Sequence, residues 1–444
     1  MKVDEYNRLT GILLEMNPEL TDLGESVFVE TEKRLKSLTL SIRCGPRLRT
    51  SYAHQACLIT AVNCGKRSFQ GGVFVEMDNE CTCVLPGFEG MPLSEVIKFQ
   101  GGILQKHHGS AKILLIGETS QSSSGLHLVF STWTGGFVKA YDSAWDKDVS
   151  FPLGAISAAA LGVATSFSAA MGIEPLADWK PQGISFWKPD RLDWQTPDPT
   201  EPTPKYFPKS VWLLGLGHLG QAYAWTIGLL PFKDGDSLFL LQDYDVVTIG
   251  NYEAGMLCER SLTNIKKARI VSKFLEKRGH KTSMVERRYT NAFARLDTDP
   301  EIMLSGLDNT VSRRTLRIQD FKGILDFGLG GNLGTFDLIR FHNLPFAGMP
   351  NEIWPESADQ DLKMDALEKL TKKLNDCGFV KGIAVSFVGV FASCIAISEV
   401  LRSYHEGLKI VKANISLRQL QKRNVIMGDH YGFEFFSGQV EFKT

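Results

Sequence analysis

The sequence predicts two tandem α/β domains, the second built on a doubly wound and mostly parallel β-sheet. Apolar runs of strand length alternate with longer helix-like stretches in both halves of the 444 residues, which favours parallel strands joined by crossover helices. Pro and polar residues over 177–210 break every apolar period. The second half also opens on a strand followed at once by a glycine-rich turn. We therefore expect domains at 1–176 and 211–444, joined by a linker at 177–210.

The composition is that of a globular protein without a polyanionic partner. Hydrophobic residues make up 43% and charged residues 22% of the chain, and the net charge of −1 leaves no basic excess for nucleic acid. The eight cysteines lie mostly in apolar runs, no C-x-x-C pair occurs, and the first residues carry no signal-peptide core. These features predict a reducing, cytoplasmic location and no nucleic-acid partner.

The first half is expected to hold four strands and two helices. The helix-like stretch "YAHQACLITAVNC" separates the first two strands. The expected strands are Leu38–Ile42, Gly72–Val75, Lys112–Ile116 and His127–Phe130. Residues 151–172 are long enough to cross a bilayer, but Ala, Gly and Ser dominate them. We expect a helix packed inside the protein there, and no membrane partner.

The second half alternates strands and helices after its glycine-rich turn. The expected elements are strands Val211–Leu214, Ser237–Gln242, Ile302–Ser305, Gly323–Asp326 and Phe336–Phe341 and helices Gln221–Leu230 and Ile265–Arg278. Both halves close with a helix rich in small residues, at 154–172 and 382–401. This similarity has two interpretations, a repeated domain or close helix packing alone.

The stretch "VWLLGLGHLGQAYAW" carries a G-x-G-x-x-G at Gly215, Gly217 and Gly220. Glycines at this spacing after a strand allow a tight turn, a close approach of backbone to phosphate, and tight packing of the helix on the strand. Asp243 and Asp245 follow the second strand, where a carboxylate can accept hydrogen bonds from ribose hydroxyls. This motif fits NAD and ATP equally well.

Polar residues further along the chain favour ATP. Asn251 and Lys267 add an amide and an ammonium group near the phosphate end of the predicted site, where phosphate transfer needs positive charge. Asp308 follows a later strand and could hold Mg²⁺, with Asn309 beside it. Two structural alternatives stay open: Lys267 could decorate an exposed helix turn, and Asp308 or Asn309 could form an Asx turn or a helix cap.

Together these residues resemble the ThiF/MoeB/HesA superfamily, the fold of ubiquitin-activating enzymes. The superfamily pattern runs G-x-G-x-x-G, D-x-D, N-x-x-R-Q, a later Lys, and D-N, and the matching positions fall in the same order between residues 211 and 403. The resemblance implies two tandem Rossmann-like, ThiF-type domains, of which the first, lacking a glycine motif, is inactive and braces the second.

The same resemblance implies roles for the site residues. Asp243 would hold the ribose of ATP, Asn251 and Lys267 would contact phosphates, and Asp308 would handle Mg²⁺. The implied reaction is adenylation of the C-terminal carboxylate of a ubiquitin-like protein, with pyrophosphate as the other product.

The sequence departs from the family pattern at one place. Ala254 and Gly255 stand where the family has Arg-Gln, so part of the phosphate grip is missing, and Arg260 is a candidate substitute. The family also borrows an arginine from the partner domain. Arg8 is the favoured candidate, ahead of Arg47 and Arg49.

The resemblance further implies a cysteine that accepts the acyl group as a thioester. The predicted crossover loop, 346–380, carries Cys377 near the start of the last helix, with several lysines in reach. Cys258 is the reserve candidate, and Cys394 is expected to be an inert core residue. Hand-over to a conjugating enzyme would follow, in a bacterial operon of antiviral type by family analogy.

Two other functions stay open on the sequence alone. An NAD-dependent oxidoreductase could use the same glycine turn, although no acid/base histidine with a carboxylate partner stands out. A non-catalytic scaffold with a degenerate adenylation fold would explain Ala254 and Gly255. A homodimer is a further expectation for either activity.

Overall fold

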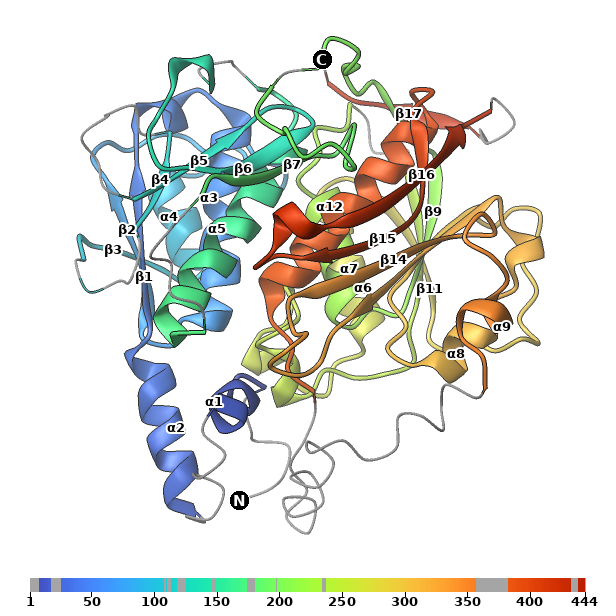
Figure 1. The fold of residues 1–444 in the computed structure, drawn as a ribbon, viewed down its shortest axis with the longest axis horizontal. Helices are drawn as coiled ribbons and strands as arrows, with labels where there is room; N and C mark the ends of the chain where they lie inside the picture. Colours follow the sequence, from blue (N-terminus) through green and yellow to red (C-terminus); the bar gives the residue numbers. More distant parts are fainter. Residues whose placement is uncertain are drawn as a thin grey trace.

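In the computed structural model the chain forms two halves, one coloured from blue to green and the other from light green to red in Figure 1. The described residues are 8–16, 25–107, 109, 113–117, 125–145, 149–173, 180–196, 198–233, 237–356, 382–432 and 438–443.

The first half is built on a seven-stranded sheet within the described residues, in the order β3-β2-β1-β4-β5-β6-β7. The strands from β3 to β5 run parallel, and β6 and β7 are antiparallel. The elements are α1 (Thr10–Met16), α2 (Glu25–Ser37), β1 (Thr39–Cys44), α3 (Tyr52–Ser68), β2 (Gly72–Met77), α4 (Leu93–Phe99), β3 (Gly102–Leu104), β4 (Ile113–Ile116), β5 (Leu126–Phe130), β6 (Thr134–Val138), α5 (Leu153–Met171) and β7 (Gln182–Ser185).

The second half repeats this plan around an eight-stranded sheet, again counted over the described part of the chain, in the order β11-β10-β9-β12-β13-β14-β15-β16. The strands from β11 to β13 are parallel, and the rest are antiparallel. The elements are β8 (Tyr206–Pro208), β9 (Ser210–Leu214), α6 (His218–Ile227), β10 (Leu238–Gln242), α7 (Lys267–Glu276), β11 (Lys281–Val285), β12 (Ile302–Ser305), α8 (Thr310–Arg314), β13 (Gly323–Leu329), β14 (Leu338–Leu344), α9 (Pro350–Ile353), α12 (Ser386–Ser403), β15 (Leu408–Ser416), β16 (Asn424–His430) and β17 (Gln439–Glu441).

Both halves are therefore Rossmann-like α/β units, as predicted. In each, the first strand lies third from the edge, and the crossover places the fourth strand on its other side. This is the arrangement that creates a ligand crevice at the carboxyl ends of the strands. The repeated strand order favours the repeated-domain interpretation over helix packing alone.

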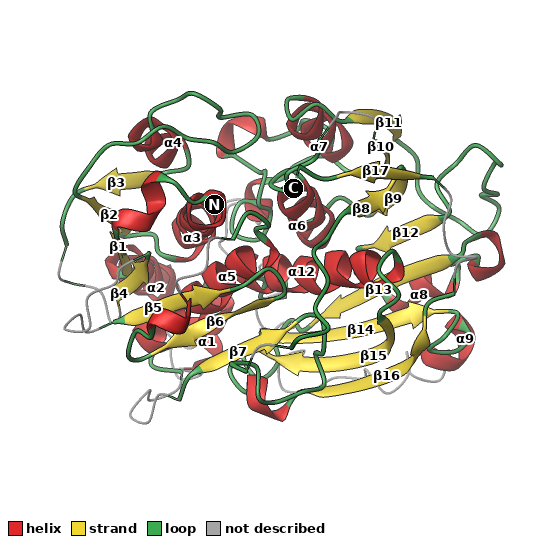
Figure 2. Cartoon of the chain, turned by 90° about the horizontal axis from the view of Figure 1, so that it is seen from above, coloured by secondary structure: helices red, strands yellow, loops and turns green. Residues whose placement is uncertain are grey.

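The two halves share one helical layer. Figure 2 shows α5 and α12 side by side through the middle of the molecule, and both are almost wholly buried. Of the described helices, these two are long and apolar enough to cross a membrane. Their burial inside the fold confirms the prediction of a helix packed inside the protein over 151–172.

Polar contacts also join the halves. Trp225 Nε1 on α6 donates to Thr60 Oγ1 on α3 at 3.1 Å, and Tyr52 on α3 donates its hydroxyl to Leu229 O at 2.8 Å. Both contacts lie between α3 of the first half and the region of α6 in the second. The first half thus packs against the helix that begins at the glycine motif.

One expectation about the elements was wrong, and several strands were not expected, namely β3, β6, β11, β15 and β16. Gln182–Ser185, expected in the linker, is the edge strand β7 and pairs with β6. The strand β6 itself was missed because glycines weaken a strand pattern. A Cβ on Gly135 would come within 2.1 Å of Gly154 O, so glycine is what allows α5 to lie directly on β6. The domain and linker bounds themselves stay a prediction.

Candidate active site

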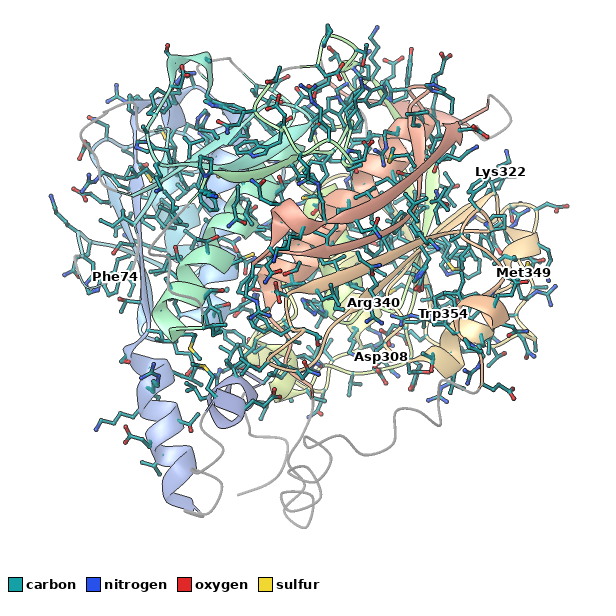
Figure 3. All side chains as sticks on the ribbon, viewed as in Figure 1. Phe74, Asp308, Lys322, Arg340, Met349 and Trp354 are labelled. Atoms are coloured by element: carbon teal, nitrogen blue, oxygen red, sulfur yellow. The ribbon has the colours of Figure 1, made fainter. Side chains whose placement is uncertain are left out.

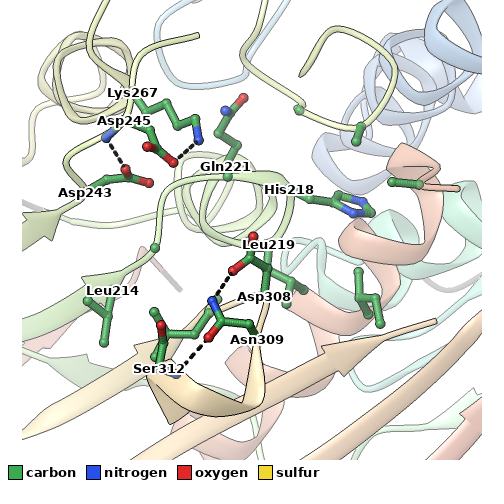
Figure 4. Close-up of a pocket in the computed structure, with 18 of the residues that line it drawn as sticks. Leu214, His218, Leu219, Gln221, Asp243, Asp245, Lys267, Asp308, Asn309 and Ser312 are labelled. Carbon is green, nitrogen blue, oxygen red and sulfur yellow. Dashed lines mark hydrogen bonds and ion pairs between the residues drawn. The ribbon is translucent and has the colours of Figure 1, made fainter. Parts of the chain in front are cut away.

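A cavity of about 500 Å³ lies at the carboxyl ends of the parallel strands of the second sheet (Figure 4). Its wall includes residues from the glycine turn, from the ends of β10 and β11, from the segment after β12, and from the first residues of the chain. The predicted site residues in this wall are Arg8, Gly215, Gly217, Asp243, Asp245, Asn251, Lys267, Asp308 and Asn309.

The three motif glycines meet different physical demands. Gly215 has φ +77°, and a Cβ there would lie 2.9 Å from Gly306 O. Gly217 precedes α6, and a Cβ there would meet nothing within 4 Å, because its backbone faces open space. Gly220 is not in the wall, and a Cβ there would lie 2.3 Å from Gly215 O. Gly215 therefore allows the tight turn, Gly217 leaves the backbone open to a ligand, and Gly220 allows the close packing of the helix on the turn.

Asp243 holds the glycine turn in place. Its Oδ2 accepts from Leu216 N and its Oδ1 from Asp245 N, both at 2.7 Å. The side chain is 8% exposed, and burial raises the pKa of its carboxyl, while the charge of Lys267 opposes that rise. Sequence reasoning did not predict this bracing role, since it depends on the approach of the turn to the end of β10.

Lys267 is the first residue of α7 and is only 8% exposed. Its Nζ donates to Asp245 Oδ2 at 3.0 Å (Figure 4). A buried ammonium that is held at a cavity wall is not a decoration of an exposed turn, so that alternative is wrong for Lys267. The ion pair with Asp245 holds the Lys267 ammonium in place beside the glycine turn.

Asn251 closes a short 3-10 helix, Ile249–Asn251, between β10 and α7. Its Oδ1 accepts from Thr248 N at 2.9 Å and from Thr248 Oγ1 at 3.2 Å. The carbonyl oxygen is therefore used within the loop. Because Asn251 also lines the cavity, its side-chain nitrogen, Nδ2, is the polar group that it can offer to a ligand.

Asp308 and Asn309 follow β12, and Figure 3 shows Asp308 at the same end of the second half as Trp354. Asn309 is the N-cap of α8: its Oδ1 accepts from Ser312 N at 2.8 Å, and its Nδ2 donates to Asp308 Oδ1 at 2.9 Å. The helix-cap interpretation is therefore correct for Asn309. Asp308 stays exposed at the cavity. In the described part of the chain, no three His, Cys, Asp or Glu side chains lie together as a metal site.

Arg8 reaches the cavity from the start of the chain. Its Nε donates to Gly250 O at 2.8 Å, next to Asn251. Burial lowers the pKa of Arg8, and the carboxylates of Glu253 and Asp308 act in the opposite direction. Arg47 and Arg49 lie in the first half and are not in the cavity wall. Of the three candidate arginines, the structure places only Arg8 at this wall.

In the segment that replaces the family's Arg-Gln, Ala254 and Gly255 both line the cavity, and Gly255 is also closely packed on one side. A Cβ on Gly255 would lie 2.7 Å from Gln221 Oε1 and 2.9 Å from Cys258 Sγ. Ala254 is 3% exposed. Arg260, the candidate substitute, is exposed, lies over the Tyr252 ring at 5.1 Å and is not in the cavity wall.

Arg67 of α3 organises the same segment from the first half. It is 1% exposed, and its guanidinium donates to three carbonyl oxygens there. These are Tyr252 O at 2.6 Å, Met256 O at 2.8 Å and Cys258 O at 2.9 Å. Sequence reasoning missed Arg67, because nothing along the chain connects α3 with this segment.

The predicted cysteines divide into three cases. Cys377 lies outside the described residues. Cys258 is 0% exposed and accepts from Gln221 Nε2 at 3.2 Å, and burial raises the pKa of its thiol. A buried thiol with a raised pKa is a poor nucleophile, so the structure does not support the reserve candidate. Cys394 is 0% exposed within α12, which agrees with an inert core residue.

Several wall residues were not among the predicted ones. Arg287 and Arg288 follow β11, and Arg313 on α8 donates to Leu307 O at 2.6 Å and Phe327 O at 2.8 Å. His218 is the first residue of α6, and burial lowers its pKa to about 3. The adjacent Arg287 and Arg288 after a strand could have been recognised in the sequence as candidates for this site. Arg313 is brought to the cavity wall by tertiary contacts.

Comparison with solved structures shows low similarity. E. coli MccB with MccA-N7isoASN is 14% identical with a TM-score of 0.33, over 51% of this chain and 66% of that one. E. coli tRNA N6-threonylcarbamoyladenosine dehydratase, TcdA, is 14% identical with a TM-score of 0.31, over 43% and 84%. The chain spans just under two thirds of the MccB length. These similarities are too low to assign a ligand or a reaction.

Two family models match most of the sequence. Residues 39–186 match the BilD N-terminal domain, and residues 207–407 match the BilD C-terminal domain. The bacterial E1-like protein BilD of Collimonas sp. (strain OK412) is 32% identical over 388 residues, which cover 84% of each chain. With two Rossmann-like units and a cavity at the glycine turn, the chain belongs to the BilD family of bacterial E1-like proteins.

Proposed function

We propose that this protein activates a ubiquitin-like protein by adenylating its C-terminal carboxylate with ATP. The carboxylate oxygen attacks the α-phosphorus, the bond to the β-phosphate oxygen breaks, and pyrophosphate leaves. The name of the relative, E1-like, supports an activating enzyme of this general kind. The ubiquitin-like partner, a conjugating enzyme, the cytoplasmic location and the antiviral setting belong to the same proposal.

One observation carries the proposal: Arg8 and Lys267, 259 positions apart, share the wall of the cavity into which the backbone of Gly217 opens. Two cations beside a helix amino end suit a polyanionic ligand. Asp243 holds the turn by two backbone hydrogen bonds and lies where ribose hydroxyls would bind. Catalysis by such a site is positioning and charge stabilisation.

The residues present also fit a magnesium ion that comes with the nucleotide. Mg²⁺ is commonly held by one or two carboxylates together with phosphate oxygens and water, and Asp308 offers an exposed carboxylate at the cavity. When bound, the ion would neutralise phosphate charge. Asn309 would orient Asp308 through the hydrogen bond from its Nδ2.

The test is ATP–pyrophosphate exchange that depends on Mg²⁺ and on a partner ending in a free carboxylate. Lys267→Ala and Asp308→Ala are each expected to lower the exchange rate by about 100-fold or more, the usual effect of removing a charge-stabilising group. Lys273→Ala, on the exposed side of the same helix, is the matched control and should leave the rate unchanged. Full activity in both site variants would sink the assignment.

We further propose that Cys377 accepts the acyl group. Its thiolate attacks the acyl carbon of the adenylate, AMP leaves, and a thioester forms. Cys377→Ser should keep pyrophosphate exchange and lose the adduct that reducing agents remove. An adduct that persists in Cys377→Ser would exclude this residue.

The scaffold alternative keeps one observation in its favour, since Ala254 and Gly255 stand in the place of the family's Arg-Gln, and a Cβ on Gly255 would lie 2.7 Å from Gln221 Oε1. Titration of the whole chain with ATP and with NADH separates the alternatives. Tight binding of ATP alone supports activation, tight binding of NADH alone supports an oxidoreductase, and the absence of both supports a scaffold.

A further inference from the structure

Gln242 Oε1 is a buried acceptor in the cavity wall to which no described residue donates; His218 Nε2 is another buried polar atom there without a described partner. Gln242, the last residue of β10, is 0% exposed, and its Nε2 donates to Arg287 O at 3.3 Å. Among the described residues, none donates a hydrogen bond to Gln242 Oε1. Buried polar atoms in folded proteins are nearly always satisfied, and an exception in a cavity wall points to a ligand that completes it.

The orientation of this amide follows from its neighbour. Turning the group over would direct Oε1 at Arg287 O and place two acceptors against each other. The contact with Arg287 O therefore fixes the Nε2 donor on one side and leaves the buried Oε1 acceptor without a donor among the described residues. A ligand that meets Gln242 must supply an N–H or O–H at that point.

The surroundings of Gln242 suit a flat aromatic ring. Tyr244 is 42% exposed, and Arg288 Cζ lies 4.8 Å from the centroid of its ring. Arg288 Nη2 also donates to the Tyr244 hydroxyl at 2.7 Å, which fixes the two planar groups together. Both residues line the cavity, and Leu307 adds apolar surface. Aromatic rings and guanidinium planes are the usual stacking partners of nucleobases.

We propose that Gln242 selects adenine among the nucleobases, with the Tyr244–Arg288 pair as the stacking wall. The inference rests on the proposed use of ATP and adds the residue that reads the base. Gln242 directly precedes Asp243, so the base would lie next to the ribose. The exocyclic amino group of adenine donates to Oε1. Guanine and hypoxanthine carry a carbonyl oxygen at that position, and two acceptors would then face each other.

The experiment uses ATP and inosine triphosphate as probes on the full chain. The two differ at the base by an amino group against a carbonyl oxygen. The wild type should bind ATP at least about tenfold more tightly, because a site built to accept a hydrogen bond discriminates against a ligand that lacks the donor. Gln242→Met should weaken ATP binding, strengthen the binding of inosine triphosphate because the contact between two acceptors is removed, and bring the ratio of the two affinities close to one.

Two further variants separate base reading from structural damage. Tyr244→Ala removes the stacking wall and should weaken both nucleotides alike, roughly tenfold. Gln421→Met, exposed and outside the cavity wall, is the matched control and should behave as the wild type. In pyrophosphate exchange, Gln242→Met should raise the KM for ATP and leave kcat at saturation unchanged, a division that general loss of structure does not produce.

The outcomes distinguish this inference from the function on which it rests. Equal binding of ATP and inosine triphosphate by the wild type, or an unchanged ratio in folded Gln242→Met, overturns the role of Gln242 and leaves ATP use standing. Failure of the wild type to bind either nucleotide overturns both.

Discussion

Replacing Arg67 by Met tests whether the first half braces the active-site segment of the second. Met keeps most of the buried apolar stem and removes the guanidinium. Three carbonyls in the segment from Tyr252 to Cys258 then lose the hydrogen bonds from that group, at 2.6, 2.8 and 2.9 Å. A buried group left unsatisfied costs about 1–3 kcal/mol.

Relief of the buried charge offsets part of this loss, and removal of one partner from a buried charged network costs about 3–5 kcal/mol in total. That is a large fraction of a stability of roughly 5–15 kcal/mol. For a domain of this size the melting temperature should fall by roughly 10 °C. Because Asn251 and Ala254 of the held loop line the cavity, the KM for ATP should rise as well.

The assay combines thermal and urea unfolding with nucleotide titration. Arg67→Lys keeps the charge but loses the fork geometry, so it should fall between the wild type and Arg67→Met. Arg34→Met, exposed on α2, is the control and should stay within about 0.5 kcal/mol of the wild type. A stability of Arg67→Met within that same margin would refute the bracing argument.

Two further predictions concern the glycine turn and the pH dependence. Gly220→Ala places a Cβ 2.3 Å from Gly215 O and should lower the free energy of unfolding by about 1–3 kcal/mol. Gly217→Ala adds a Cβ that meets nothing within 4 Å, so it should weaken ATP binding while the stability stays near normal. Equal melting curves for the two variants would contradict this. Burial lowers the pKa of His218 from 6.5 to about 3, so the unfolded chain binds a proton in that window that the folded chain does not. The stability that depends on a neutral His218 is therefore fully present above pH 6.5. As the pH falls from 6.5 towards 3, the free energy of unfolding decreases by about 1.4 kcal/mol per pH unit. In urea unfolding at several pH values, His218→Gln should show a shallower decline over this range, and parallel curves would rule out His218 as a source.

Most of the parallel strands could be predicted from the sequence, because a strand buried on both faces is a continuous apolar run. The run "VWLLGLG" predicts both β9 and the turn after it, and "IMLS" coincides with β12. The strands not expected from the sequence include β3, β11, β15 and β16 as well as β6, whose glycines serve the approach of α5, and β7, which lies in a polar stretch and pairs with β6. Local patterns do not contain either reason.

The same division holds for the site. Gly215, Asp243, Lys267 and Asp308 could be named from the sequence, because each follows a strand or begins a helix at the edge where parallel strands end. The bracing of the turn by Asp243 and the cap formed by Asn309 appear only in the folded structure, since hydrogen bonds to neighbouring backbone depend on the loop conformation.

The sequence by itself determined that there are two α/β halves, that the second carries the glycine turn, and which polar residues follow its strands. These features are local, because strand, turn and helix signals are read within a few residues of each other. Only the tertiary structure decided that Arg8 and not Arg47 reaches the cavity, that Arg67 holds the segment around Ala254, and that no described residue donates to the buried Gln242 Oε1. These contacts join residues far apart in the chain, and only the packing of the two halves brings them together.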